Sequence, residues 1–504
     1  MLWKRVWSGL AAMVLALSCA GWAMAEGTKN AYVMAGFDDT NLRQWESNRF
    51  FIRMEELTGV SFSFRQYTDL AAWKSYKASL TKDGELPDVL FKAMLTPSEC
   101  IDLKEKGVLI DLKPYLEKYA PHIWAILQEQ KDALEAVTLP DGSIVALPYL
   151  NAVPAQNYIW INQQWLDYLR LDMPTTAEEL VNVLTAFQTR DPNRNGKKDE
   201  IPLGFLGPFD LKFLAHAFGL ICNDYNIFEQ NGQVKFMPLE ENYRLFVTWC
   251  RDLYQAGLLD SNGFSTADSL RRVTDKNATP MYGAIMTTVP GNLFQVTWAE
   301  QYTVVPPLTY EGKQVYRDFF GSVQRGTFAI TSACASPETL LQWVDFLYTE
   351  EGAILSTAGQ ENIDYLVDGD GSWRLVEAAQ SNSSAFIASE LMDGGAAMPG
   401  ITPSEFILRF NGQTDAYRAN MEKQIELKSL CVRPFPYVSL TTAQEAEVTR
   451  MQNQLGAYVD VQLARWVLGE ETISDASFEQ FKNTLEEKGL SAFLAFWQDV
   501  LDHR

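Results

Sequence analysis

Short apolar runs alternate with amphipathic helical patterns in the first part of the chain. The expected elements, in order, are a strand, a helix, a strand, a helix and a strand, at residues 31–37, 40–57, 60–67, 71–80 and 89–94. This order predicts a parallel sheet that is covered by helices. Ligands of such sheets bind beyond the carboxyl ends of the strands. Asp39 and Lys92, which follow the first and third strands, are therefore candidate ligand-binding residues.

After these elements the alternation of strands and helices is interrupted, first by a predicted hairpin and then by a passage into a second unit. Asp141-Gly142 between two short apolar runs, residues 136–138 and 144–146, predicts a β-hairpin. Tyr149 follows at the expected first passage out of this part of the chain, where a second α/β unit begins, and the last hundred residues are mostly helical. Six further residues are candidate ligand-binding residues, because they follow predicted strands or lie in loop-like, Gly-flanked or polar surroundings. They are Phe209, Asp210, Asn292, Trp298, Phe320 and Trp373.

Asp191 to Pro202, with the sequence DPNRNGKKDEIP, is the most specific motif. Calcium takes six to eight oxygen ligands at about 2.3–2.6 Å, and a glycine at the sixth position of such a loop allows a sharp turn. The predicted ligands are the side chains of five residues and one backbone carbonyl: Asp191, Asn193, Asn195, the Lys197 carbonyl, Asp199 and Glu200. The alternative is a polar turn, because Asn, Gly and Asp all favour turns. Since the oxygens and Gly196 are in register, we predict a structural calcium ion.

Composition narrows the class of protein. The chain has 504 residues, of which 47% are hydrophobic and 12% aromatic, enough for two or three domains with sizeable cores. The net charge of −22 argues against nucleic acid and anionic membrane surfaces as partners. After the first 25 residues no segment has about 18 uninterrupted apolar residues, so no membrane span is expected.

Residues 1–25 have the pattern of a signal peptide. Two positive charges precede an apolar core, and Ala23-Met24-Ala25 forms a small-residue cleavage site. Residues 15–19 also resemble a bacterial lipobox, and cleavage there would leave a lipid anchor on Cys19. The five later cysteines have no disulfide or metal-binding spacing, and we expect them to be buried free thiols.

Several motifs together resemble the family 1 extracellular solute-binding proteins of bacterial ABC importers, in the long branch that includes the alginate-binding proteins. Besides the calcium loop, the matching segments span nearly the whole chain: 86–89 (LPDV), 147–149 (LPY), 359–365 (GQENIDY), 465–470 (RWVLGE) and 487–490 (EKGL). The segment 359–365 departs from the glycine-rich GxxGxDY form of that motif.

The resemblance implies an α/β fold with two lobes, of the type II periplasmic-binding-protein kind, with hinge strands between the lobes and extra C-terminal helices. The first lobe is expected at 26–148 and 306–398, and the second at 149–305 and 399–504. It also implies a monomer outside the cytoplasmic membrane that holds a carbohydrate, most simply an oligosaccharide, between its lobes and delivers it to the permease.

The aromatic content suits a sugar site, because sugars present apolar ring faces together with hydroxyl groups. Two other hypotheses remain open on the sequence. An exported glycosidase would need a pair of carboxylates, which a sequence does not exclude, although no GxSxG or HExxH motif is present. A ligand-binding partner of a sensor receptor would have the same fold and the same binding chemistry. We expect a binding protein without catalytic activity.

Overall fold

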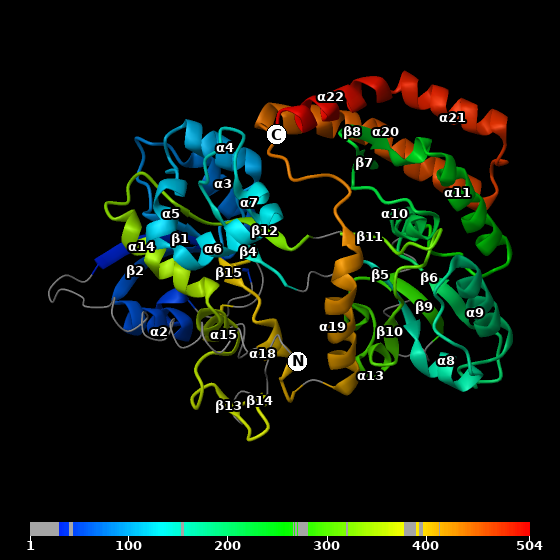
Figure 1. Ribbon diagram of the computed structural model, residues 1–504, viewed down its shortest axis with the longest axis horizontal. Coiled ribbons are helices and arrows are strands. Elements are labelled where there is room, and N and C mark those ends of the chain that lie inside the picture. Colours follow the sequence, from blue (N-terminus) through cyan, green and yellow to red (C-terminus); the bar gives the residue numbers. More distant parts are fainter. Residues whose placement is uncertain are drawn as a thin grey trace, which may run out of the picture.

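The computed structural model describes residues 30–39, 44–152, 156–265, 267, 270, 281–318, 321–376, 390–392, 397–412 and 414–504. Two α/β lobes lie side by side, and helices from the end of the chain extend along the top of the molecule (Figure 1). The predicted two-lobed α/β fold with additional C-terminal helices is confirmed. The predicted signal peptide, with Cys19, lies outside the described residues.

The first lobe contains a six-stranded sheet with the order β15-β4-β12-β3-β1-β2. Its strands are β1 (Asn30–Phe37), β2 (Val60–Tyr67), β3 (Val89–Phe91), β4 (Leu147–Leu150), β12 (Val323–Ile330) and β15 (Gly400–Ile401). β1 pairs in parallel with both β2 and β3, as the alternation of strands and helices predicted. β12 runs antiparallel to β3 and β4, so strands from three distant parts of the chain form this sheet.

Helices cover both faces of this sheet. They are α2 (Arg49–Thr58), α3 (Leu70–Ser79), α4 (Pro97–Glu105), α5 (Lys113–Tyr119), α6 (Pro121–Glu129), α7 (Lys131–Val137), α14 (Pro337–Asp345) and α15 (Glu350–Ala358). α2 begins where the Asn48 side chain accepts a hydrogen bond from the Phe50 amide, and it ends at Gly59, whose φ of 69° is left-handed. Its buried Phe51 packs against Trp343 of α14 and against Phe91 of β3, and the contact with Phe91 holds the helix against the sheet.

The hairpin predicted around Asp141-Gly142 is wrong. Residues 131–137 form α7 instead, because Ala133, Ala136 and Val137 recur at helical spacing and are buried on one face. The turn after it is closed by a hydrogen bond from the Gly142 amide to the Leu139 carbonyl (2.8 Å).

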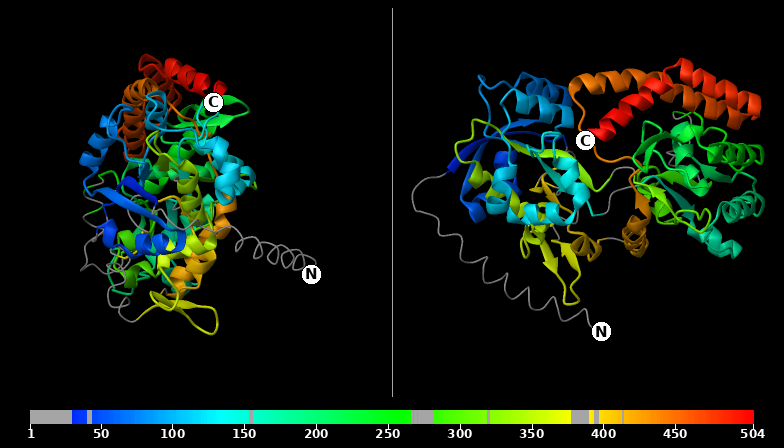
Figure 2. Two further views of the ribbon diagram at one scale, coloured as in Figure 1. Left: turned by 90° about the vertical axis from the view of Figure 1, so that its left-hand side faces the viewer. Right: turned by 45° about the horizontal axis from the view of Figure 1, so that its top comes forward.

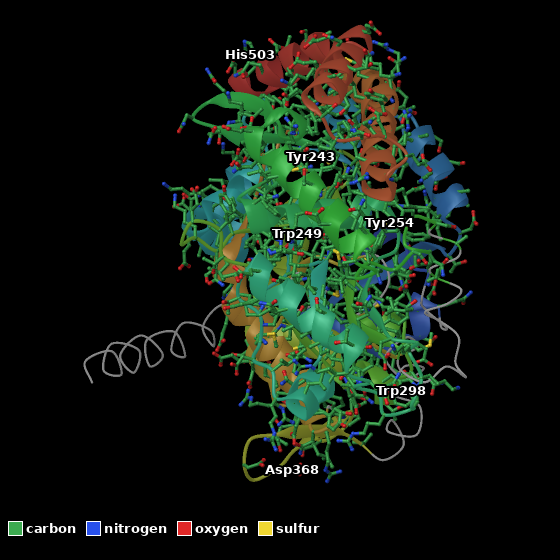
Figure 3. The ribbon with its side chains drawn as sticks, turned by 90° about the vertical axis from the view of Figure 1, so that its right-hand side faces the viewer. Tyr243, Trp249, Tyr254, Trp298, Asp368 and His503 are labelled. Atoms are coloured by element: carbon green, nitrogen blue, oxygen red, sulfur yellow. The ribbon has the colours of Figure 1, made fainter. Side chains whose placement is uncertain are left out.

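The second lobe contains a four-stranded sheet with the order β10-β5-β9-β6. Its strands are β5 (Tyr158–Asn162), β6 (Ile201–Gly204), β9 (Tyr282–Thr287) and β10 (Tyr302–Val304). The helices of this lobe include α8 (Gln163–Leu169), α9 (Ala177–Thr189), α10 (Pro208–Leu211), α11 (Glu241–Gln255) and α13 (Val296–Ala299). α11 can be located in Figure 3 by Tyr243, Trp249 and Tyr254, and Tyr243 is fully buried.

The C-terminal helices are α20 (Thr442–Leu468), α21 (Asp475–Glu487) and α22 (Leu490–Asp502). α20 packs along α11, and Trp466 and Phe481 are buried in the same core as the strands of the second lobe. The views in Figure 2 show the same arrangement from two other sides.

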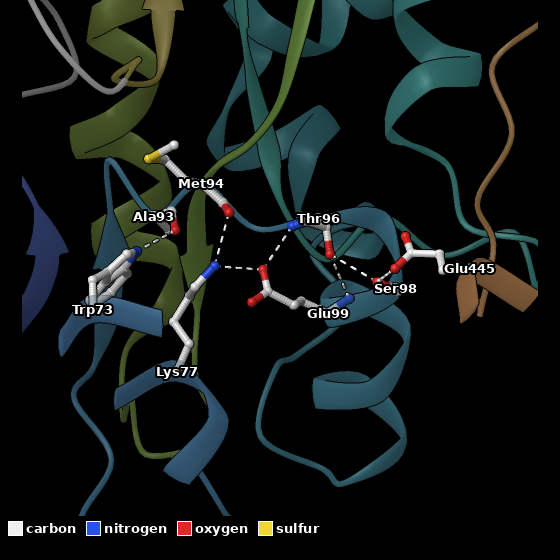
Figure 4. Close-up of polar contacts among 8 residues, drawn as sticks. All are labelled: Trp73, Lys77, Ala93, Met94, Thr96, Ser98, Glu99 and Glu445. Atoms are coloured by element: carbon white, nitrogen blue, oxygen red, sulfur yellow. Dashed lines mark hydrogen bonds and ion pairs between the residues drawn. The ribbon is translucent and has the colours of Figure 1, made fainter. Parts of the chain in front are cut away.

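α20 also contacts the first lobe. The Ser98 hydroxyl of α4 donates to the Glu445 carboxylate at the beginning of α20 (2.7 Å; Figure 4). α4 itself begins with a capping box of Thr96 and Glu99, and the buried Lys77 ammonium donates to Glu99 and to the Met94 carbonyl. The C-terminal helices therefore contact both lobes.

Along the described ranges of the chain, passages between the lobes fall in three places. They lie between β4 and β5, between Asp318 and β12, and between β15 and α19 (Asp415–Leu427), which packs against β10. The second passage is further along the chain than the expected lobe division after residue 305, because Leu308 and Tyr316 are buried in the core of the second lobe. The third passage follows β15, which still pairs with β4 of the first sheet.

All five cysteines in the described part of the chain are free thiols, as predicted. Cys100, Cys222 and Cys250 are buried, whereas Cys334 and Cys431 are half-buried. None of the helices in the described ranges is long and apolar enough to cross a membrane.

Candidate functional site

A pocket with a volume of about 360 Å³ lies where the lobes meet. Its lining comes from the ends of β4 and β15, from β5 and the segment after β9, and from α18 (Ser404–Leu408) and α19. The lining residues are Asn151, Trp160, Val289, Pro290, Gly291, Ala299, Glu300, Thr402, Ser404, Ile407, Thr414, Tyr417, Asn420, Met421 and Gln424. Because both sheets contribute, a molecule in this pocket contacts both lobes.

Hydrogen bonds fix the first-lobe wall of the pocket. Tyr149 in β4 and Thr402 are joined through their hydroxyl groups (2.9 Å), and the Thr402 hydroxyl donates to the Asn151 side-chain oxygen (3.2 Å). Tyr149, a predicted ligand-binding residue, thus lies directly behind two pocket residues. Its hydroxyl group helps to hold the Thr402 and Asn151 side chains in place.

The second-lobe wall contains an aromatic ring in a fixed position. Trp160 of β5 is 3% exposed, and its indole nitrogen donates to the Thr287 carbonyl of the neighbouring strand (2.9 Å). Pro290 and Gly291 follow β9 and line the pocket, and the predicted residue Asn292 is exposed immediately after them. The prediction for Asn292 thus falls one residue from the pocket lining.

α19 forms the third wall. Its Asn420 side chain donates to the Tyr302 carbonyl (2.8 Å) and accepts from the Val304 amide (3.3 Å), which attaches the helix to the edge strand β10. Tyr417, one turn earlier, is 48% exposed and lines the pocket. α19 therefore presents an accessible aromatic ring from a helix that is fixed to the second lobe.

The predicted residues at the strand ends of the first lobe do not line this pocket. Asp39 is exposed after β1. Lys92 is 1% exposed, with its ammonium 3.5 Å from the Asp38 carboxylate, which also accepts a hydrogen bond from the Trp45 indole (3.0 Å). Burial next to Asp38 gives Lys92 an internal electrostatic partner in the first lobe.

Phe209 and Asp210 lie at a second polar cluster, outside the pocket lining. The Asp210 carboxylate accepts hydrogen bonds from the Asn157 side chain (2.8 Å) and the Leu206 amide (2.7 Å). Burial raises the pKa of Asp210, and these two hydrogen bonds oppose the rise. The Phe209 ring lies 5.1 Å from the Lys212 ammonium and packs on Phe213. Asp210 thus fixes the segment before β5.

The remaining three candidates have different surroundings. Trp298 is half-buried in α13, close in sequence to the pocket residues Ala299 and Glu300 (Figure 3). Trp373 is 5% exposed and stacks on Phe406 (centroids 4.3 Å apart), so its ring packs the hairpin of β13 (Tyr365–Val367) and β14 (Trp373–Leu375) onto α18. Phe320 lies outside the described residues. A ligand-binding role for the predicted residues remains a prediction.

Sequence reasoning missed most of the pocket lining, notably Trp160, Glu300 and the residues of α19. One signal was present. Thr414, Tyr417, Met421 and Gln424 are spaced by three or four residues and so share one face of a helix. A core-facing helix would carry Leu or Val at such positions, so this mixed face of tyrosine, methionine and amide side chains was recognisable as lying outside the core.

The loop predicted to bind calcium connects α9 to β6. The Asp191 carboxylate accepts hydrogen bonds from the backbone amides of Asn195 and Gly196 (both 3.1 Å), and Gly196 has a left-handed φ of 73°. The side-chain amides of Asn193 and Asn195 donate to Asp199 (3.1 and 3.0 Å). The loop is therefore curled with its polar side chains facing one another.

The surroundings of the Glu200 carboxylate indicate whether the residues of this loop fit a cation. One of its carboxylate oxygens is buried and has no hydrogen-bond partner in the described part of the chain. Burial raises the pKa of Glu200, and the negative charges of Asp199 and Asp191 raise it further. Within the described ranges no three His, Cys, Asp or Glu groups form a metal cluster, so a cation here also needs amide and backbone oxygens. Such a mixed oxygen set fits calcium.

Comparisons with known proteins agree with this architecture. No protein-family model matches the chain. The chain is 28% identical over 478 residues to FusA, a fructooligosaccharide ABC transporter substrate-binding protein of Streptococcus pneumoniae, and the match covers 89% of this chain and 86% of FusA.

Solved structures show the same fold. An "HMO binding" ABC-transporter-associated solute-binding protein of Bifidobacterium longum infantis has a TM-score of 0.76 at 21% identity, covering 95% of this chain and 99% of that protein. FusA in complex with kestose has a TM-score of 0.66 at 24% identity, covering 94% and 99%.

Two further solved structures share this fold. One is an EF-hand mutant of FusA in complex with fructo-nystose (24% identity, TM-score 0.66). The other is the alginate-binding protein AlgQ2 without calcium ion (20% identity, TM-score 0.63). The chain is thus a relative of the substrate-binding proteins of ABC transporters, as its sequence motifs predicted.

Proposed function

We propose that this chain is the extracytoplasmic solute-binding component of an ABC importer, which binds an oligosaccharide between its lobes and delivers it to the permease. The observation that carries the proposal is the pocket at the junction of the lobes, with walls from both sheets and from α19. The relationship to FusA, which binds fructooligosaccharides, supports the same class of ligand.

The chemistry of the pocket suits a sugar. Tyr417 offers an accessible aromatic ring on which the apolar face of a sugar ring stacks, and Ser404 and Gln424 offer polar groups for its hydroxyls. A ligand that contacts both lobes favours the closed arrangement by its differential affinity for that state. Movement would occur in the three segments between the lobes, and the permease would recognise the closed form.

Replacing Tyr417 with Ala is expected to weaken saccharide binding by about 1–2 kcal/mol, because an accessible stacking surface that lines the pocket is removed. The fold should persist, since the side chain is 48% exposed. A thermal-shift screen over a glycan panel identifies a ligand first, because ligand at 100 times its Kd adds about 2.7 kcal/mol. Calorimetric titration then compares the variants.

Tyr168 of α8 provides a matched control. It is 45% exposed in the same lobe and does not line the pocket, so Tyr168→Ala should leave the affinity unchanged. Equal affinities of the wild type and Tyr417→Ala for every saccharide that binds would contradict the proposed site.

We also infer a structural calcium ion in the loop from Asp191 to Glu200. The proposed ligands are the six predicted in the sequence, and the unpartnered buried oxygen of Glu200 supports them. The EF-hand of FusA and the calcium ion of the alginate-binding protein support this assignment by analogy. The ion would hold the loop closed between α9 and β6.

We further propose that the protein does not hydrolyse its ligand. Glycosidases use two carboxylates about 5–10 Å apart, whereas Glu300 is the one carboxylate among the described residues that line the pocket. Prolonged incubation with a bound oligosaccharide, followed by chromatography, should recover it intact. Turnover that one Asp or Glu substitution abolishes would favour the glycosidase hypothesis instead.

Capture of a receptor kinase or chemoreceptor by the ligand-bound protein would favour the sensor hypothesis.

Export through the predicted signal peptide completes the proposal, because an importer's binding component acts outside the cytoplasmic membrane. Cleavage after Ala25 and lipidation at Cys19 give mature chains that differ in mass. Mass spectrometry of the mature protein distinguishes them.

A further inference from the structure

The pocket at the junction of the lobes has many polar groups, but its described lining carries one negative charge and no positive charge. Among its described lining residues, Glu300 carries the one formal charge, and no Lys, Arg or His is present. The other polar groups there are hydroxyls and amides: Asn151, Thr402, Ser404, Thr414, Tyr417, Asn420 and Gln424. The relatives include binders of both neutral and acidic saccharides, so relationship alone does not decide which kind this chain takes.

Glu300 is placed to act on a ligand. It is half-buried directly after α13, where the chain turns towards the edge strand β10. Within the described ranges it forms no ion pair or hydrogen bond, so no other side chain neutralises or occupies its carboxylate. A carboxylate in this state accepts hydrogen bonds from two neighbouring sugar hydroxyls, and it repels a carboxylate on the ligand.

The cations of α19 do not offset this charge. Arg418 pairs with Asp415 of its own helix (3.6 Å), and the Lys423 ammonium donates to the Thr303 hydroxyl of β10 (3.4 Å). Neither residue lines the pocket. A uronate carboxylate in the pocket would therefore lose water without gaining a cationic partner, which is unfavourable.

Building on the proposed function, we propose that this pocket selects uncharged oligosaccharides and excludes uronate oligomers, with Glu300 as the residue that discriminates between them. Glu300 accepts hydroxyl hydrogen bonds from a neutral sugar and repels an acidic one. The selectivity thus comes from one unpaired carboxylate, in a site where the other described lining residues are uncharged.

The test uses the mature protein and calorimetric titration with two sets of trisaccharides of matched size. The neutral set is kestose, maltotriose and xylotriose, and the acidic probe is trigalacturonate. The wild type is expected to bind at least one neutral trisaccharide about a hundredfold more tightly than trigalacturonate. Glu300→Gln keeps the shape and removes the charge, so this ratio should fall by about tenfold. Glu300→Lys should lower the ratio further.

The control is Glu105→Gln, an exposed carboxylate at the end of α4 that should leave the ratio unchanged. Thermal unfolding of each variant shows whether it is folded. Two results would overturn the proposed selectivity: preferential binding of trigalacturonate by the wild type, or an unchanged affinity ratio in Glu300→Gln. Either result would leave the proposed saccharide-binding function standing. Absence of binding to either set overturns both.

Discussion

Removal of calcium is expected to destabilise the protein by about 4 kcal/mol relative to the protein with free calcium at roughly 1,000 times its Kd. The physical reason lies in the loop from Asp191 to Glu200. Without a cation, the negative charges of Asp199 and Asp191 oppose ionisation of Glu200, and one Glu200 oxygen is buried without a partner in the described part of the chain. A divalent cation satisfies that oxygen and offsets the repulsion, so it stabilises the folded state over the unfolded one.

Calorimetric unfolding with calcium and with an excess of chelator measures this effect, and elemental analysis gives the stoichiometry, which should be one ion per chain. Glu200→Gln should reduce the calcium-dependent increase in melting temperature. Asp370→Asn is a matched control, because Asp370 belongs to an acidic Asp-Gly turn in which it accepts hydrogen bonds from Ser372. Identical melting with and without calcium, together with no bound calcium, would rule out the ion.

The parts of the fold that were predictable depend on local patterns. β1, β2 and β3 and the helices between them follow from apolar periodicity over short stretches of chain, and their parallel pairing follows from the alternation. The loop from Asp191 to Glu200 could be singled out as a candidate calcium site because all its expected ligands lie within ten residues, and calcium binding there stays a prediction. In contrast, residues 136–138 were predicted to form a hairpin strand, whereas residues 131–137 form α7, since a short apolar run fits either period.

The pocket was not predictable for a different reason. Trp160, Glu300 and Tyr417 come together through the sheet of the second lobe and through the attachment of α19 to β10 by Asn420, a contact between residues more than a hundred positions apart. Burial likewise is a property of the folded chain. Lys92 at a strand end looked accessible, but it lies beside Asp38 in the interior.

Acid is expected to destabilise the second lobe through His216, by about 3 kcal/mol when the pH falls from above 6.5 to 4. His216 is 2% exposed, and its two ring nitrogens are both used. Nδ1 donates to the Phe213 carbonyl (2.6 Å), and Nε2 accepts from the Leu308 amide (3.0 Å), which lies on the segment after β10. Burial lowers the pKa of His216 to about 4, because a charged ring would lose hydration and its Nε2 would no longer accept.

The sign of the His216 effect follows from proton linkage. The unfolded chain takes up the proton near pH 6.5 and the folded chain only near pH 4, so this stability is present above pH 6.5 and is lost as the pH falls through that window. His122 acts in the opposite direction, because its hydrogen bond to Asp345 raises its pKa.

Denaturant unfolding at pH 7, 5 and 4 should therefore compare wild type with His216→Gln, whose side-chain oxygen can still accept from the Leu308 amide but does not titrate. The variant should lose less stability in acid than the wild type, whereas His503→Gln, at an exposed histidine, should behave like the wild type. Parallel losses in wild type and His216→Gln would show that other groups govern the acid response.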